Sequence, residues 1–355
     1  MEARVQSLQK AMLGKGEAAF VLSPAGCRYL TGFDAEDCAV LITEKSAYFL
    51  TDDRYIEAAN ETVQGLKPIS CNGLFSTLFD LLKAEKIERL YLEQSLSLSA
   101  FSRLKAGCPA TLVPDDTLDY HLSSMRQVKD EKELSLLREA QRLTEKGFEH
   151  ILPFLTTGIS ERDAALELEF FMRRQGADGV SFDFIVISGK NTSRPHGVPT
   201  DKVIEPGDFV TMDFGALYRG YHADMTRTVA IGEVTDEMKR VYDTVLSAQQ
   251  TALSVLRAGI SGKVGDEAAR RVIEKAGYGD YFGHGTGHGV GLEIHEAPRL
   301  SPRASDDPLP VGAVVTVEPG IYLPGRFGVR IEDMVVLTEN GCENLTRTPK
   351  ELLIL

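Results

Sequence analysis

The sequence predicts an α+β protein of two domains, a smaller α/β domain at residues 1–122 and a larger one at residues 126–355. Three observations predict this class. A chain of 355 residues is long enough for two domains. Helical and strand-like patterns alternate along the chain, and one strand pattern in the second part occurs twice. Hydrophobic residues (43%) and charged residues (26%) occur in the proportions of an ordinary globular protein.

Composition excludes several classes of partner. A net charge of −13 disfavours nucleic acid and anionic membranes, because both repel an acidic surface. The chain has no apolar run of signal-peptide or membrane-spanning length, so we expect a cytoplasmic protein. The cysteines are odd in number and lack a C-x-x-C spacing, which predicts reduced thiols without a metal or catalytic role: Cys27, Cys38, Cys71, Cys108 and Cys342.

The first domain shows short strands between amphipathic helices. Residues 4–13 predict a helix, because Val5, Leu8 and Met12 recur on one side. Residues 74–84 predict a second helix, and residues 29–33 predict a turn. The polar residues 114–124 predict a linker to the second domain. Strands are expected at residues 18–22, 39–43, 47–51 and 89–93.

Four helices are expected in the second domain. Asp130 with Glu133 is a capping box that begins a long helix. Ser160 and Thr235 begin two more helices, and residues 266–276 predict a fourth. Because these helices alternate with β-hairpins, we expect a single sheet covered by helices on one face.

The repeated strand pattern carries the chemistry. Residues 207–215 and 312–320 both fit G-x-x-V-T-hydrophobic-acid-x-G, and their acids are Asp213 and Glu318. A second acid follows each copy, Asp224 after the first and Glu332 or Asp333 after the second. A hairpin centred on residues 218–219 would place Asp213 directly opposite Asp224. Four carboxylates in one cleft repel each other unless cations neutralise them, so the pattern predicts two divalent metal ions and a hydrolase.

The second copy leaves one ambiguity. Aligning the repeats makes Asp333 the counterpart of Asp224. Neighbours on a strand point to opposite faces, so only one of Glu332 and Asp333 can reach the metals.

Histidines concentrate in the same region, where five of the seven fall between residues 196 and 295. His284 and His288 are four residues apart but flanked by glycines, so they do not form a zinc-binding helix. One of them can be a metal ligand while the other reaches the substrate. His196 lies between Pro195 and Gly197, a loop context that exposes its ring.

These motifs together resemble the metallopeptidases of the pita-bread fold, and specifically the Xaa-Pro peptidases (prolidase or aminopeptidase P type). The resemblance covers nearly the whole chain and implies a pita-bread, creatinase/aminopeptidase-like second domain after a creatinase-type N-terminal domain. It selects Glu332 over Asp333 and implies the metal ligands Asp213, Asp224, His288, Glu318 and Glu332. It also implies catalytic or substrate-binding roles for His196, His284, His295 and Arg330.

The implied activity is hydrolysis of the bond between an N-terminal residue and proline. Two ions can hold a hydroxide between them and polarise the scissile carbonyl, while His196 and His295 stabilise the oxyanion or carry a proton. Four carboxylates and one imidazole favour Mn²⁺, with Co²⁺, Zn²⁺ or Fe²⁺ as alternatives. The expected partners are small proline-containing peptides and a second copy of the chain in a homodimer.

Three other interpretations stay open. A methionine aminopeptidase-like enzyme shares the fold and the ligands, a creatine-hydrolysing relative needs no metal, and a binding homologue has lost activity. The sequence does not choose between dipeptides and longer peptides as substrates.

Overall fold

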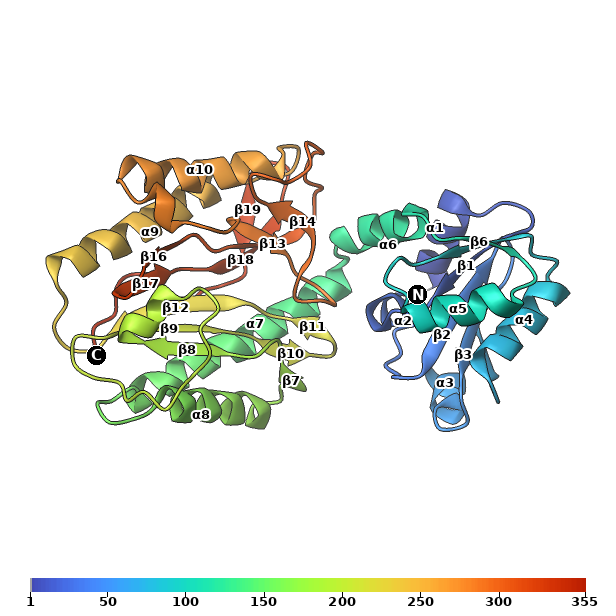
Figure 1. The fold of residues 1–355 in the computed structure, drawn as a ribbon, viewed down its shortest axis with the longest axis horizontal. Coiled ribbons are helices and arrows are strands. Elements are labelled where there is room, and N and C mark those ends of the chain that lie inside the picture. The colour runs from blue at the N-terminus through green and yellow to red at the C-terminus, as the bar shows by residue number, and fades with distance from the viewer. Residues whose placement is uncertain (1) are drawn as a thin grey trace. The chain divides into compact units, whose positions relative to one another are not determined.

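The structure, a computed structural model, describes residues 2–355. It divides into two compact units, the first ending at Arg126 and the second spanning Gln127–Leu355 (Figure 1).

The first unit is built on a six-stranded sheet with the strand order β4-β3-β2-β1-β5-β6. Strands β1, β2 and β3 pair antiparallel, and β4, β5 and β6 join them in parallel. The strands are β1 (Glu17–Val21), β2 (Cys38–Thr43), β3 (Ala47–Thr51), β4 (Lys67–Ser70), β5 (Arg89–Leu92) and β6 (Thr111–Val113). The helices are α1 (Glu2–Met12), α2 (Pro24–Thr31), α3 (Ile56–Thr62), α4 (Leu74–Ala84), α5 (Leu98–Gly107) and α6 (Thr117–Gln127).

Two predictions for this unit were wrong. The expected turn at residues 29–33 is the end of helix α2, which begins after the N-cap Ser23 and stops at Gly32 with φ 72°. The expected linker is helix α6, because Leu118 and Leu122 lie four residues apart and bury one face of an otherwise polar segment.

The predicted caps begin the helices of the second unit. The Asp130 side chain accepts from the Glu133 backbone and the Glu133 side chain accepts from the Asp130 backbone, which completes the capping box. Ser160 and Thr235 cap their helices in the same way through one hydrogen bond each. The helices are α7 (Glu131–Ile151), α8 (Glu161–Arg174), α9 (Asp236–Val255) and α10 (Gly262–Lys275), with 3₁₀ turns η1 (Leu152–Phe154), η2 (Gly189–Ser193) and η3 (Gly279–Tyr281).

The strands of this unit form four sheets within the described residues, so the expectation of a single sheet was wrong. Their orders are β11-β10-β7, β12-β9-β8, β14-β13-β15-β18-β19 and β16-β17. The first six strands are β7 (Gly179–Val180), β8 (Ile185–Ser188), β9 (Phe209–Phe214), β10 (Ala216–Tyr218), β11 (Tyr221–His222) and β12 (Met225–Ala230). The others are β13 (Gly287–Gly289), β14 (Glu296–Leu300), β15 (Val314–Val317), β16 (Gly320–Leu323), β17 (Phe327–Arg330), β18 (Asp333–Leu337) and β19 (Cys342–Asn344).

Each helix pair borders mainly one group of strands, although α7 also packs against β15 and β18. Helices α7 and α8 border β8 to β12, and α9 and α10 border β13 to β19 (Figure 1). Along β9, Val210, Met212 and Phe214 enter the core with α7 and α8. Asp213 alternates with them and therefore points to the other face, which is where the site lies. Among residues 2–355, no helix has the length and apolar character that a bilayer crossing requires.

Candidate metal centre

The first hairpin carries Asp213 on β9 and Asp224 immediately before β12. Its turn is Arg219–Gly220, where both residues have positive φ (46° and 80°), as a two-residue hairpin turn requires. The strands pair so that Thr226 lies opposite Asp213 and Met225 lies opposite Phe214. The predicted direct pairing of Asp213 with Asp224 was therefore wrong, because the turn lies one residue later than expected. Asp213 therefore pairs with the residue two positions after Asp224. Because side chains two positions apart on a strand point to the same face, the Asp213 and Asp224 carboxylates still lie on one face of the hairpin.

The second hairpin resolves the ambiguity between Glu332 and Asp333. Strands β15 and β18 pair with Val317 opposite Asp333, which places Glu318 and Glu332 at the adjoining position. The Asp333 carboxylate turns away into the core, where Oδ1 accepts from Arg227 Nη2 at 2.8 Å. Its Oδ2 accepts from Lys350 Nζ at 2.7 Å, Asn344 Nδ2 at 2.8 Å and Gln249 Nε2 at 2.9 Å. Glu332 faces the cavity.

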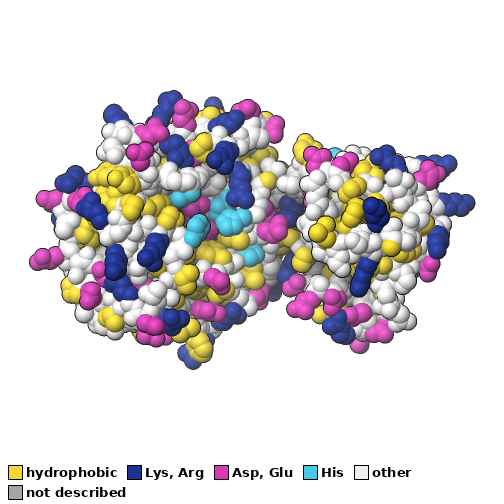
Figure 2. All heavy atoms as spheres, in the orientation of Figure 1, with side chains coloured by type: hydrophobic (Ala, Val, Ile, Leu, Met, Phe, Trp, Pro, Cys, Tyr) yellow, Lys and Arg dark blue, Asp and Glu magenta, His cyan; other side chains and the backbone are white. Residues whose placement is uncertain are grey.

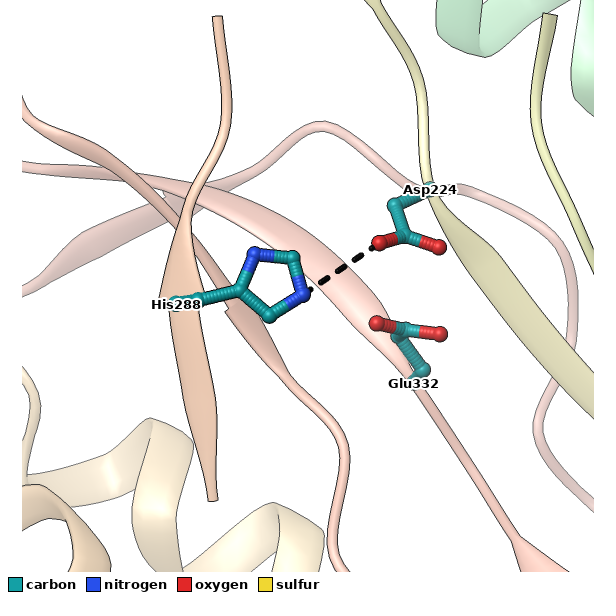
Figure 3. Close-up of side chains that lie close together, drawn as sticks. All are labelled: Asp224, His288 and Glu332. Atoms are coloured by element: carbon teal, nitrogen blue, oxygen red, sulfur yellow. Dashed lines mark ion pairs between the residues drawn. The ribbon is translucent and has the colours of Figure 1, made fainter. Parts of the chain in front are cut away.

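Acids from both hairpins converge on His288 of strand β13. Ligand atoms of Asp224, His288 and Glu332 all lie within 4.8 Å of one another, and all three residues are buried (Figure 3). The His288 Nε2 atom lies 3.5 Å from Asp224 Oδ2 and 3.3 Å from Glu318 Oε1.

The His288 ring shows that a cation fits here. Its Nδ1 lies 3.1 Å from the Gly289 carbonyl oxygen, which can only accept, so we assign the ring proton to Nδ1. Burial and the neighbouring His295 lower the pKa of His288 to about 3, so the ring is neutral. Its Nε2 lone pair therefore faces two carboxylate oxygens. Three acceptor atoms that converge on one point suit a positive ion, which would remove the repulsion between them.

The carboxylates show the same crowding. Burial, together with Glu332, Asp213 and Glu318, raises the pKa of Asp224 well above its usual value. Burial and the same kind of repulsion raise the pKa of Glu332, and burial raises that of Glu318 to about 8. Asp213 Oδ1 is buried and accepts no hydrogen bond within residues 2–355. Oxygen-rich sites of this kind suit divalent cations.

Arg330 and Tyr322 support the acids from one side. Arg330 Nη2 donates to Asp213 Oδ2 at 2.6 Å, and its Nε donates to Thr226 Oγ1 at 3.0 Å. Thr226 in turn donates to Glu332 Oε2 at 2.6 Å. Arg330 Nη1 also donates to the Tyr322 hydroxyl and to the Pro195 carbonyl. Most of its N–H groups are thus engaged by protein, which leaves little of the guanidinium for the predicted substrate contact.

The predicted histidines surround the same cavity but differ in environment. His284 has protein partners at both nitrogens, the Gly285 carbonyl at Nδ1 and the Tyr322 hydroxyl at Nε2, each at 2.8 Å. The His295 ring is exposed and lies edge-on to His288, with centroids 4.3 Å apart. His196 is exposed in the turn after η2 and lines the same cavity. Burial, with a smaller contribution from Arg330, lowers the pKa of His284 to about 4, and burial also lowers the pKa of His295.

These residues line a cavity of about 940 Å³ within the second unit. Histidine side chains gather on the visible face of this unit in Figure 2. Phe182, Val198 and Ile294 give the cavity apolar walls, and Arg299 supplies a cation. Arg299 lies opposite His288 across β13 and β14, so its side chain leaves the same face. We did not predict Arg299, Tyr322 or Phe182, because each reaches the site through long-range strand pairing or a loop.

Fold and site together define a metallohydrolase: an α+β domain that gathers acids and a neutral imidazole in a cavity, preceded by a smaller α/β domain. Comparison with known proteins agrees. The profile of Metallopeptidase family M24 matches residues 135–339, and that of the Creatinase/Prolidase N-terminal domain matches residues 4–128. The chain belongs to metallopeptidase family M24 and has its pita-bread fold.

Three similar proteins match this chain over nearly their full length. The uncharacterized peptidase YqhT of Bacillus subtilis is 46% identical over 338 residues, which cover 94% of this chain and 95% of the relative. The structure of an Xaa-Pro dipeptidase from Bacillus anthracis is 42% identical, with a TM-score of 0.96 and 99% of each chain covered. That of an X-Pro aminopeptidase from Thermotoga maritima is 39% identical, with a TM-score of 0.89, and covers 98% of this chain and 99% of that chain.

Proposed function

We propose that this enzyme hydrolyses Xaa-Pro dipeptides with two divalent metal ions held by Asp213, Asp224, His288, Glu318 and Glu332. The observation that carries the metal proposal is the neutral His288 ring, whose Nε2 lone pair faces carboxylate oxygens of Asp224 and Glu318. When bound, the ions activate water for attack and polarise the scissile carbonyl. The hard oxygen ligands favour Mn²⁺, with Co²⁺, Zn²⁺ or Fe²⁺ as alternatives.

His196 and His295 act on the substrate in this proposal. Both rings are exposed and line the cavity beside the acids. Either can donate a hydrogen bond to the developing oxyanion or a proton to the leaving proline nitrogen. His284 holds the Tyr322 hydroxyl, which also accepts from Arg330, so it supports the site from behind.

Arg299 favours dipeptides over longer substrates. In Xaa-Pro the proline carries a free carboxylate close to the scissile bond, and a guanidinium is well suited to bind it. Arg299 lies on the His288 face of the cavity, which His295 also lines. The apolar Phe182 and Ile294 in the same cavity suit the proline ring.

Steady-state kinetics with Ala-Pro, Ala-Pro-amide and Ala-Pro-Ala in Mn²⁺ tests this function. We expect Ala-Pro to be cleaved best and Arg299→Gln to raise its KM at least tenfold, while KM for Ala-Pro-amide stays unchanged. Arg299→Lys, which keeps the charge, should lose less. Equal effects of Arg299→Gln on Ala-Pro and its amide would contradict carboxylate binding. The homodimer remains a prediction, which light scattering of the pure protein would measure.

A further inference from the structure

A buried carboxylate lies behind the loop that carries His196. Glu161 is the first residue of α8 and is 0% exposed. Its Oε1 accepts from Ser188 N at 2.6 Å, Ser188 Oγ at 3.0 Å and Asn191 Nδ2 at 3.0 Å. Its Oε2 accepts from Thr200 Oγ1 at 2.6 Å, Thr200 N at 3.0 Å and Asn191 Nδ2 at 3.2 Å. All of these donors are uncharged.

The donors belong to the two ends of one loop. Ser188 ends β8 and Asn191 lies in η2, whereas Thr200 follows His196 by four residues. Glu161 therefore closes the segment 188–200 at its base. The Arg162 N–H adds a backbone bond to the Thr200 carbonyl at 3.1 Å.

The far side of this loop is held by strand β17. The Gly328 N–H donates to Thr192 Oγ1 at 2.8 Å, and Arg330 Nη1 donates to the Pro195 carbonyl at 3.2 Å. The loop thus lies between Glu161 and the strand whose Arg330 also binds Asp213. Its backbone has a defined position relative to the acids.

The His196 ring itself has no hydrogen-bond partner anywhere in the described part of the chain. It lines the cavity and is exposed, so the backbone of its loop sets the point from which the ring extends into the cavity. Whatever fixes that backbone limits the positions that the imidazole can reach.

We propose that Glu161 is a positioning residue for His196, which it holds at the cavity by closing the loop 188–200. The inference rests on the proposed role of His196 at the substrate. A carboxylate is required because it only accepts, and both oxygens face donors. Glutamine would place its NH₂ group against the N–H of either Ser188 or Thr200. Both groups are donors, and a backbone N–H cannot accept a hydrogen bond, so that contact would be lost. One end of the loop would then lose its anchor.

A double-mutant cycle tests this inference. In Mn²⁺-loaded full-length protein we expect His196→Ala to lower kcat for Ala-Pro on the order of 100-fold, as removal of a proton-transferring or oxyanion-binding group does. Glu161→Gln should lower kcat about tenfold or more, because small displacements of a catalytic group are costly. In the His196→Ala background, Glu161→Gln should change kcat less than twofold. Mn²⁺ stoichiometry and affinity, measured by titration calorimetry, should match the wild type in Glu161→Gln.

Asp163→Asn is the matched control, because it removes one charge from an exposed side chain in the same turn of α8, where its carboxylate bonds to Ser160 and not to the loop. Its kcat should equal that of the wild type. If Glu161→Gln does not fold, Thr200→Val replaces it, since it removes the hydroxyl bond to Oε2 and, besides that, only the bond that the hydroxyl accepts from the Lys202 N–H. Its smaller loss of kcat should also vanish in the His196→Ala background.

Equal losses from Glu161→Gln in both backgrounds would overturn the inference, because Glu161 would then act independently of His196. Unchanged kcat and KM in His196→Ala would instead refute the role of His196 and, with it, the inference. Absence of Ala-Pro cleavage by the Mn²⁺-loaded wild type would refute the proposed function alone.

Discussion

Asp333→Asn and Glu332→Gln should affect metal-free protein in opposite ways, although the two residues are neighbours. Asp333 is 0% exposed and accepts four hydrogen bonds, two of them from the cations Arg227 and Lys350. Burial alone would raise the pKa of Asp333, but these cations hold it below its usual value. Asparagine at this position removes the negative charge, and its NH₂ group faces N–H donors that previously bonded to a carboxylate oxygen.

The size of the effect follows from Arg227, whose side chain is 2% exposed. Removing one partner of a buried ion pair costs about 3–5 kcal/mol. Arg227 keeps its bonds to the carbonyls of Thr226, Glu332, Thr348 and Pro349, which places the expected loss near the lower end, about 3 kcal/mol. We expect Mn²⁺ binding by Asp333→Asn to keep its stoichiometry.

Glu332→Gln removes a charge from a crowded group of acids. Glu332 is 1% exposed and close to Asp224, Asp213 and Glu318. The amide oxygen can still accept the Thr226 hydroxyl bond. Metal-free Glu332→Gln should therefore be at least as stable as the wild type, but it should bind one ion fewer.

Urea unfolding in EDTA at pH 7, followed by far-UV circular dichroism, measures both stabilities, and calorimetric titration with Mn²⁺ measures the ions bound. Unchanged m-values would confirm that the differences lie in the folded state. The assignment of Glu332 to the metals and Asp333 to the core is refuted if Glu332→Gln is the less stable variant in EDTA. It is equally refuted if Asp333→Asn loses an ion.

Three further predictions concern the metals, a close contact and the surface. Purified protein should contain two divalent ions per chain by elemental analysis and lose Ala-Pro hydrolysis in EDTA, with recovery in Mn²⁺; full activity of ion-free protein would exclude the proposed mechanism. Gly215→Ala should lower the melting temperature by several degrees or prevent folding, because a Cβ there would lie 1.7 Å from the Ala223 carbonyl oxygen; a melting temperature equal to the wild type would show that the hairpin adjusts. Arg271→Ala should change the free energy of unfolding by less than about 0.5 kcal/mol, because its ion pair with Glu267 is exposed; a larger loss would contradict this.

Local signals predicted the elements that local interactions build. The caps at Asp130, Ser160 and Thr235 placed three helices, because each cap bonds within its own first turn. Helix α10 begins at Gly262, four residues earlier than predicted. The sequence did not indicate this start, because glycine has a low helix propensity. The reason for glycine is tertiary: a Cβ at Gly262 would lie 2.0 Å from the Arg299 carbonyl oxygen. The division of the strands into several sheets depends on pairings between distant segments, which no local pattern records.

The candidate site divides in the same way. The repeated motif predicted the acids that the structure gathers near His288, while their roles as ligands remain a prediction. The choice between Glu332 and Asp333 depends on the register of β15 with β18, which the sequence alone does not record. The family resemblance selected Glu332 without that register. Arg299 was missed because only the pairing of β13 with β14 brings it beside His288. Glu161 resembles any acid in the first turn of a helix, and nothing near it in sequence indicates Thr200 as its partner.

The acids and His288 come from two different sheets, which the Glu332 N–H joins at the site by a hydrogen bond to the Thr226 carbonyl at 3.1 Å. Asp213 and Asp224 come from the hairpin of β9 and β12, whereas His288, Glu318 and Glu332 come from the sheet of β13, β15 and β18. Ions bound by both sheets would hold them together in the folded state only. The free energy of unfolding would therefore rise with free metal concentration, by about 2.7 kcal/mol at 100 times the dissociation constant. Amide hydrogen exchange in β12 and β18 should slow together when metal is added. Metal supply would then govern how long the folded enzyme persists as well as how fast it works.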